Sequence, residues 1–330
     1  MNPILSIKDL GVTFDTPRGP ARAVDGVSLD LYPGETLALV GESGCGKTVT
    51  ALSILRLLPE PAARVAGGAS ITFGGTDLLR VAPEELRRTR GAGIAMVFQE
   101  PTTSLNPVLP VGWQIAETVL AHQNVTRESA RARAIEMMQL VGIPDPAERY
   151  RSYPHQLSGG LCQRVMIAIA LVCSPRVLIA DEPTTALDVT IQAQILELLM
   201  GLKKRLGLSM LLISHDLGLV AGVADRIAVM YGGRIVEQAS TADLFSRPVH
   251  PYTEGLLGAI PRIDRPAATL AAIPGSVPPA TSWPSGCRFH PRCAHAWERC
   301  SAIEPDLLDS GPNRSARCWL VSEPARRRQP

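Results

Sequence analysis

The sequence has no long apolar run and no marked excess of charge of either sign. Its longest uninterrupted apolar run, Val165 to Cys173, is far shorter than the roughly 20 residues that cross a bilayer. Lysine plus arginine number 33 and aspartate plus glutamate 31, so composition does not indicate steering toward nucleic acid. The opening MNPILSIKDLGVTF lacks the basic and then apolar pattern of a signal peptide. We therefore expect no nucleic-acid partner, and any link to a membrane should go through a partner protein.

The seven cysteines do not suggest a disulfide framework, because their number is odd and three lie in segments typical of a cytosolic enzyme. These three are Cys45, Cys162 and Cys173. The other four gather near the C-terminus, with the spacing C-x5-C-x6-C-x17-C: Cys287, Cys293, Cys300 and Cys318.

Strand and helix patterns alternate from residue 1 to about 260. The run ETLALV is typical of a buried strand, and KTVTALSILRLL predicts the helix after it. The short apolar runs RVLIAD and SMLLIS favour parallel strands covered on both faces. Between the first strand–helix pair and these two later strands, from about 80 to 175, the signals are mostly helical, as in VGWQIAETVLAHQ, RESARARAIEMMQLVG and the stretch after Ser158. This pattern predicts an α/β core with an inserted helical subdomain.

Proline marks a boundary near the C-terminal end. Seven of the 28 prolines lie between Pro261 and Pro291, and such a run disfavours regular structure. We expect a main domain at 1–261, a linker near 262–285 and a small Cys-rich extension within 262–330.

The stretch GESGCGKT matches the phosphate-binding pattern G-x-x-x-x-G-K-[ST] between a predicted strand and a predicted helix. Its glycines allow the backbone to wrap phosphates, and the amide groups and the lysine supply positive potential. The threonine hydroxyl is a candidate Mg²⁺ ligand. The predicted ATP-binding residues here are Gly41, Glu42, Ser43, Gly44, Cys45, Gly46, Lys47 and Thr48.

Further polar residues complete a predicted site for phosphate hydrolysis. The strand VLIAD ends in Asp181, a candidate Mg²⁺ ligand, followed by Glu182, which could lie beside the attacking water. His215 follows another strand and could orient the terminal phosphate or polarise the water. Gln99 in MVFQEP could reach both Mg²⁺ and water.

A second Ser-Gly-Gly stands at a predicted helix start in YPHQLSGGLCQR. Ser158 and the amides of Gly159 and Gly160 would form another anion site. Taken together and in their order along the chain, the motifs resemble those of the ATP-binding subunits of ABC transporters over about residues 4 to 260. GESGCGKT is similar to Walker A, VLIADEP to Walker B, LSGG to the signature, and ALD, ending at Asp188, to the D-loop.

The resemblance implies roles for single residues and for a partner. It implies that Gln99 is the Q-loop residue, His215 the switch histidine, and Phe14 the ring against adenine, although a strand phenylalanine is more often in the core. It also implies head-to-tail dimers, in which each ATP lies between one P-loop and the partner's signature and D-loop. Leu161 departs from the glutamine usual after the glycine pair, which puts contacts from that position in doubt.

Three stretches are similar to the peptide/nickel importer branch: VFQEPTTSLNPVLPVGWQI, DEPTTALDVTIQAQIL and HPYTEGLLGAIPR. That branch implies two distinct ATPase subunits, here preferably a heterodimer, under two membrane permeases fed by an external binding protein. The chain would then be peripheral at the cytoplasmic face of the membrane. Oligopeptides or dipeptides are the first choice of cargo, then nickel or other small solutes. A non-transport ABC ATPase and a Cys-rich nucleic-acid-binding ATPase remain alternatives.

The four C-terminal cysteines suit either zinc or an iron–sulfur cluster. Structural zinc sites usually have short C-x2-4-C spacings, which this segment lacks. The resemblance of GCRFHPRC to the extension of that branch implies a [4Fe–4S] cluster, held by Cys287, Cys293, Cys300 and Cys318. Zinc, or packed cysteines without metal, stay open.

Overall fold

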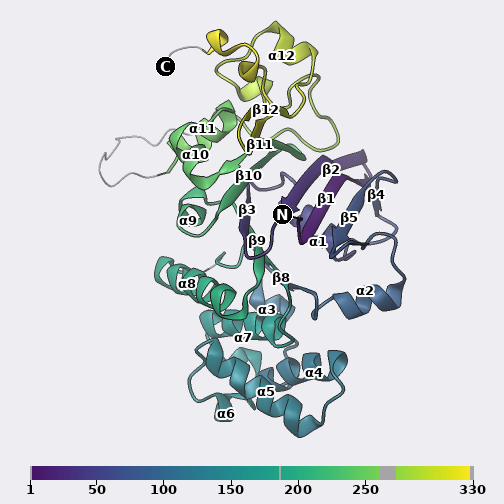
Figure 1. The fold of residues 1–330 in the computed structure, drawn as a ribbon, viewed down its shortest axis with the longest axis vertical. Coiled ribbons are helices and arrows are strands. Elements are labelled where there is room, and N and C mark those ends of the chain that lie inside the picture. Colours follow the sequence, from purple (N-terminus) through teal and green to yellow (C-terminus); the bar gives the residue numbers. More distant parts are fainter. Residues whose placement is uncertain (1, 186, 261–272, 328–330) are drawn as a thin grey trace. The chain divides into compact units, whose positions relative to one another are not determined.

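The computed structural model describes residues 2–185, 187–260 and 273–327. The chain divides into two compact units (Figure 1). The signature unit comprises Met1–Asn2, Tyr32–Glu35 and Arg80–Ile213, and the P-loop unit comprises Pro3–Leu31, Thr36–Leu79 and Ser214–Pro330. None of the helices in the described ranges is both long enough and apolar enough to span a membrane. Of the linker predicted near 262–285, residues 262–272 lie outside the described residues.

Parallel strands form the sheet part of the signature unit. Strand β8 (Val177–Asp181) pairs in parallel with β7 (Ile94–Val97) and with β9 (Ser209–Ser214). All residues of these three strands are buried, as expected of apolar strands covered on both faces. The two parallel strands predicted from RVLIAD and SMLLIS are confirmed, whereas β7 lies within the interval expected to be mostly helical.

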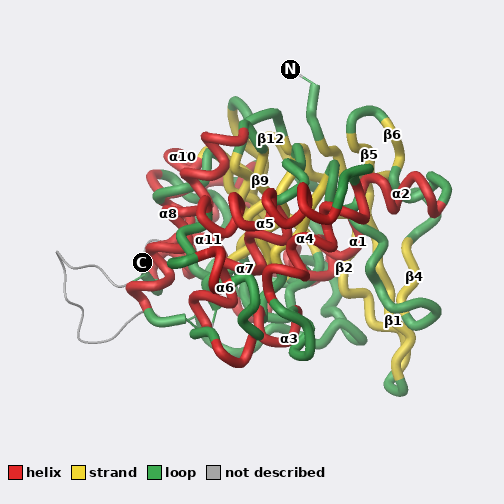
Figure 2. Tube along the Cα trace, turned by 90° about the horizontal axis from the view of Figure 1, so that it is seen from below, coloured by secondary structure: helices red, strands yellow, loops and turns green. Residues whose placement is uncertain are grey.

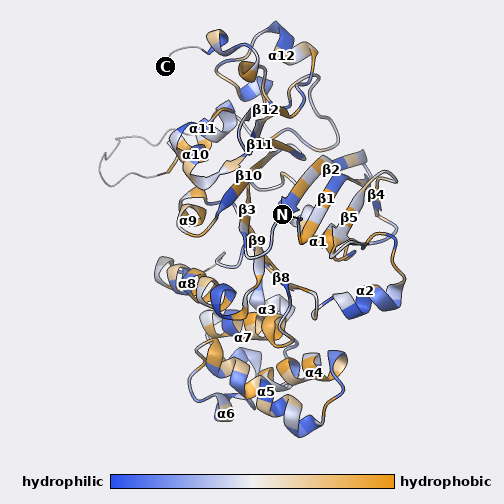
Figure 3. Ribbon diagram, in the orientation of Figure 1, coloured by the Kyte–Doolittle hydropathy of each residue, from blue (hydrophilic) through white to orange (hydrophobic). Residues whose placement is uncertain are grey.

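Helices make up most of the rest of this unit. Helices α4 (Val111–His122), α5 (Arg127–Leu140) and α7 (Gly159–Leu171) pack on one another (Figures 1 and 2). Helix α7 is mainly apolar and α2 (Pro83–Thr89) is strongly charged, as the orange and blue colours of Figure 3 show. The remaining helices are α3 (Pro101–Ser104), α6 (Pro146–Arg149) and α8 (Val189–Leu206). The helices predicted around 111–123 and 127–142 are thus present.

An antiparallel sheet, not predicted from the sequence, forms one part of the P-loop unit. Strand β1 (Leu5–Thr16) pairs with β2 (Gly19–Leu31), β4 (Ala63–Val65) and β5 (Ser70–Phe73), and β5 pairs with β6 (Thr76–Asp77). In β1, Leu5, Ile7, Leu10 and Val12 are almost fully buried. Burying one face of this sheet supplies an apolar driving force that strand pairing alone would not.

The second sheet part of this unit joins strands that are distant in the sequence. Strand β3 (Thr36–Val40), followed by α1 (Lys47–Ile54), pairs in parallel with β10 (Arg226–Tyr231). Strand β10 pairs antiparallel with β11 (Arg234–Ser240), and the C-terminal strands continue the order as β13 (Arg314–Ala316) and β12 (Leu308–Gly311). Besides α1, the described residues of this unit form the α-helices α9 (Leu217–Ala221), α10 (Thr241–Ser246), α11 (Pro251–Gly258) and α12 (Glu298–Ala302).

Candidate nucleotide site

The GESGCGKT loop connects β3 to α1, and two of its glycines have no room for a side chain. Gly41 has φ 156°, and a Cβ there would lie 2.1 Å from the carbonyl oxygen of Met230. Gly46 has φ 109°, and its Cβ would lie 2.5 Å from the carbonyl oxygen of Ala23. The loop can therefore take this path only with glycine at both positions.

Lys47 lies folded into this loop. Its side chain donates hydrogen bonds to the carbonyl oxygens of Gly41 at 2.8 Å and Glu42 at 3.2 Å, and the residue is 4% exposed. Cys45 is fully buried, and this burial raises the pKa of its thiol. Ser43, Gly44 and Thr48 are exposed. The loop thus has a compact inner side and an exposed side that can receive phosphates.

In the signature unit, the structure brings Gln99 and Glu182 together. Glu182 directly follows β8, and its backbone has φ 45°, a left-handed conformation that is uncommon for glutamate. Its Oε2 accepts hydrogen bonds from Nε2 of Gln99 at 3.1 Å and from the hydroxyl of Thr185 at 2.9 Å. Asp181, the last residue of β8, is 2% exposed. Sequence analysis did not single out Thr185, although the residue pattern DEPTT contained it.

The signature serine begins helix α7. Oγ of Ser158 accepts from the backbone N–H of Leu161 at 3.4 Å, an N-cap interaction. Ser158 and Gly159 are exposed, so the helix start is open to solvent. The side chain of Gln163 donates to the carbonyl oxygen of Pro183 at 2.7 Å, which ties the signature helix to the turn after Glu182.

Three other predicted residues lie at the ends or edges of elements. Asp188 caps α8 by accepting from the N–H of Ile191 at 3.0 Å. Phe14 is half-buried in β1, and His215 is exposed between β9 and α9. The roles of Phe14 and His215 toward ATP stay predictions.

The four C-terminal cysteines line one cavity. His250 and Trp319 also contribute to its wall, and no disulfide joins any of the seven cysteines. Burial raises the pKa of Cys287 and of Cys318 to about 12, so these thiols are protonated near neutral pH. Among the described residues, no group of three or more His, Cys, Asp or Glu side chains is arranged to hold a metal ion. The thiols thus share a cavity without the tight cluster that a single ion requires.

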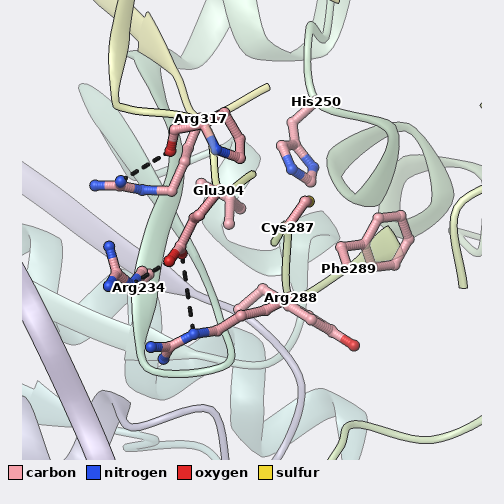
Figure 4. A pocket seen from close by; sticks show the side chains of 10 residues that line it. Arg234, His250, Cys287, Arg288, Phe289, Glu304 and Arg317 are labelled. Carbon is pink, nitrogen blue, oxygen red and sulfur yellow. Dashed lines mark hydrogen bonds and ion pairs between the residues drawn. The ribbon is translucent and has the colours of Figure 1, made fainter. Parts of the chain in front are cut away.

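The extension that carries these cysteines is tied to other parts of the P-loop unit through arginines. Arg288 pairs with Asp25 and donates to the carbonyl oxygen of Gly232 at 2.5 Å. Arg234 and Arg288 both reach Glu304, as Figure 4 shows. Burial lowers the pKa of Arg288. Sequence analysis missed these contacts, because their partners are far apart in the chain.

Two segments of the chain match models of known protein families. Residues 24–185 match the family model of the ABC transporter, and residues 236–300 match that of the oligopeptide/dipeptide transporter, C-terminal region. The dipeptide transport ATP-binding protein DppD of Bacillus subtilis is 50% identical, over 98% of this chain and 97% of that protein. The oligopeptide transport ATP-binding protein OppD of Escherichia coli is 46% identical, over 97% of this chain and 94% of that protein.

Solved structures show the same cassette fold. A dimeric ATP-binding cassette in a post-hydrolysis state, bound to ADP and Pi, matches with a TM-score of 0.64 and 25% identity, over 72% of this chain and 98% of that one. The protein cbiO1 of Clostridium perfringens, part of an ABC transporter complex, matches with a TM-score of 0.62 and 26% identity, over 75% of this chain and 92% of that one. The chain therefore belongs to the ABC transporter family, as an ATP-binding subunit that hydrolyses ATP.

Proposed function

We propose that this ATPase powers the import of oligopeptides or dipeptides. The observation that carries the proposal is the match of residues 236–300 to the C-terminal region of oligopeptide/dipeptide transporters. Identity of 46% to 50% with OppD and DppD along nearly the whole chain supports it. Nickel or another small solute is the second candidate cargo.

The chemistry follows from the residues placed above. Lys47 and the loop amides would bind the phosphates, and Thr48, Gln99 and Asp181 would hold Mg²⁺. Glu182 would accept a proton from the attacking water, with Gln99 and Thr185 fixing its carboxylate. His215 would stabilise the terminal phosphate, and Phe14 would contact adenine.

ATP would lie between the P-loop of one subunit and the signature of another. The exposed start of α7, with Ser158, Gly159 and Gly160, supports this reading, since a helix N-terminus attracts anions. Asp188 would contribute from the same partner. The dimeric state of the solved cassette bound to ADP and Pi also supports it. A dilute monomer should therefore hydrolyse ATP slowly, and adding its partner subunit should raise turnover.

The proposed assembly is a second, distinct ATPase subunit, two transmembrane permeases and an external solute-binding protein. The chain would sit at the cytoplasmic face of the membrane, with a domain boundary near 261.

Uptake of labelled dipeptides and tripeptides in a strain lacking the subunit tests the cargo. Restored uptake on re-expression supports the proposal, and restored nickel uptake alone would favour the second candidate. Co-purification without permeases would favour a non-transport or nucleic-acid-binding ATPase.

We also propose that the extension holds a [4Fe–4S] cluster with a structural or regulatory role. Its ligands would be Cys287, Cys293, Cys300 and Cys318. Their common cavity supports this, because four cysteine thiolates are the usual ligands of such a cluster. A bound cluster would keep the four thiols deprotonated, against the raised pKa that burial alone imposes on Cys287 and Cys318. Zinc is the alternative metal at this site.

Anaerobic purification tests this site. The protein should be brown, and Cys293→Ser should remove the colour, while Cys173→Ser, which lies outside the cavity, should keep it. Colourless protein with stoichiometric zinc would assign the site to zinc, and colourless protein without metal would leave the cysteines as packing residues.

A further inference from the structure

We propose that Arg292, in the Cys-rich extension, positions the P-loop for ATP by pairing with Glu42. The proposal rests on the nucleotide site of the family and adds a residue from outside the cassette motifs. Arg292 lies between Cys287 and Cys293 and is 250 positions from Glu42 in the chain.

The two side chains form a bidentate ion pair. One terminal nitrogen of Arg292 lies 2.6 Å from Oε2 of Glu42, and the other lies 3.0 Å from Oε1. Nε of Arg292 donates to the carbonyl oxygen of Pro274 at 2.8 Å, and the terminal nitrogens also reach the Tyr231 hydroxyl and the Ile273 carbonyl. The guanidinium therefore has one well-defined orientation, which a lysine could not reproduce.

Backbone contacts of Glu42 connect its paired side chain to the rest of the phosphate-binding loop. Its backbone N–H donates to the hydroxyl of Tyr252 at 2.8 Å, and its carbonyl oxygen accepts from Lys47 at 3.2 Å and from the N–H of Cys45 at 3.3 Å. The extension thus holds the side chain of a residue whose backbone contacts the phosphate-binding lysine. A shift of Glu42 would move the carbonyl that Lys47 contacts.

The ion pair also changes the net charge of the phosphate-binding loop. Glu42 is the only acidic residue of the GESGCGKT loop, and an uncompensated carboxylate there would repel a triphosphate. Arg292 cancels this charge from a buried position, since its side chain is 4% exposed while that of Glu42 is 32% exposed. Arg292 therefore makes the loop more favourable for an anion without itself occupying the exposed side.

Packing connects Arg292 to the cysteine cavity. Phe289, three residues before it, packs against Tyr231 with ring centroids 5.2 Å apart, and Tyr231 packs against Tyr252 at 4.7 Å. Phe289 lines the cavity with the cysteines, and Tyr252 holds the Glu42 N–H. The fold of the cysteine segment and the position of Glu42 are thus set by one aromatic cluster.

Binding of MgATP to the full chain, measured by equilibrium titration, tests the proposal. Arg292→Ala should weaken ATP binding by about tenfold, raising KM for ATP more than it lowers kcat. Adding Glu42→Gln to Arg292→Ala should recover affinity only to within about threefold of the unsubstituted chain, because it removes the unpaired charge but does not restore the constraint that the pair places on the loop. Arg292→Lys should lose about threefold. Arg299→Ala, an exposed arginine of the same extension that pairs with Glu323, is the matched control and should not change affinity.

Unchanged affinity in Arg292→Ala, or a loss that Glu42→Gln does not relieve, would overturn the proposal and leave Arg292 a purely structural residue. If Arg292→Ala does not fold, Arg292→Lys decides, and full affinity in that variant would equally overturn it. A failure of the unsubstituted chain to bind MgATP would instead contradict the proposed function.

Discussion

Two glutamates, one in each unit, each follow the end of a buried strand and are held in opposite ways. Glu182 in the signature unit accepts hydrogen bonds from the neutral side chains of Gln99 and Thr185. Glu42 in the P-loop unit is paired with the charged guanidinium of Arg292. Neutral donors orient a carboxylate and keep its negative charge available, whereas arginine cancels that charge. The contrast fits a proton acceptor on one side and a phosphate-binding loop on the other.

The residues that contact the two glutamate side chains also differ in how far they lie from them in the sequence. Thr185 is three residues from Glu182, and Gln99 is 83 residues away. Arg292 comes from the C-terminal extension, 250 residues away. Glu182 therefore has one local and one distant support, whereas the arginine that pairs with Glu42 comes from the Cys-rich extension.

The largest expected effect is the loss of hydrolysis in Glu182→Gln. The amide keeps the shape of the side chain but cannot accept the proton of water, so kcat should fall by about a hundredfold or more. ATP affinity should stay near that of the unsubstituted chain. Steady-state phosphate release and nucleotide titration measure the two quantities, and turnover at the normal rate would remove Glu182 from the reaction.

A smaller loss, in binding rather than in turnover, is expected from Gly46→Ala. A Cβ there would lie 2.5 Å from the carbonyl oxygen of Ala23 at φ 109°, so the loop must shift and ATP affinity should fall by more than about tenfold. Gly44→Ala separates the two causes, because Gly44 also has a positive φ, 79°, but its Cβ would meet nothing within 4 Å, so the loss there should be smaller. Equal losses in both variants would show that backbone conformation, and not the close contact, is what matters.

Thr185→Val tests the hydrogen bond that orients the carboxylate of Glu182. It removes the hydroxyl 2.9 Å from Glu182 while keeping the branched shape, and kcat should fall about three- to tenfold with little change in KM. Arg292→Ala should show the reverse split, with the change mainly in KM. If both variants changed the same parameter, the assignment of separate roles to the two glutamates would be wrong.

The last expected effect is on stability and not on activity, and it is a pH dependence that comes from His250. Burial lowers its pKa to about 3 from the usual 6.5, and its Nδ1 accepts from the N–H of Tyr252 at 3.0 Å. Between these two values the unfolded chain binds a proton that the folded chain does not, so stability falls as pH drops below 6.5. The slope should approach about 1.4 kcal/mol per pH unit.

Urea unfolding at pH 7.5 and 5.5 measures this slope. His250→Gln should reduce the difference between the two pH values, whereas His155→Gln, at an exposed position, should leave it unchanged. An unaltered difference in His250→Gln would show that other groups carry the pH dependence.

The sequence by itself determined the features that depend on neighbouring residues. The phosphate-binding loop, the parallel strands β8 and β9 and the helices α4 and α5 follow from local patterns of glycine, apolar and helix-forming residues. The order of the motifs was enough to place the chain in its family. Periodicity did not predict the antiparallel pairing of β1 with β2, β4 and β5, because pairing partners are chosen by burial across the fold.

Only the tertiary structure decided which distant side chains meet. The contact of Gln99 with Glu182 spans 83 positions and that of Arg292 with Glu42 spans 250, and no spacing rule predicts such pairs. Strand β13 of the Cys-rich extension pairs with β11 and continues the sheet of the P-loop unit, a pairing that the sequence did not predict. Unsatisfied strand edges and buried charges are costly, so partners for them are found wherever the folded chain supplies them. That requirement acts on the whole fold, which is why it leaves no local signal in the sequence.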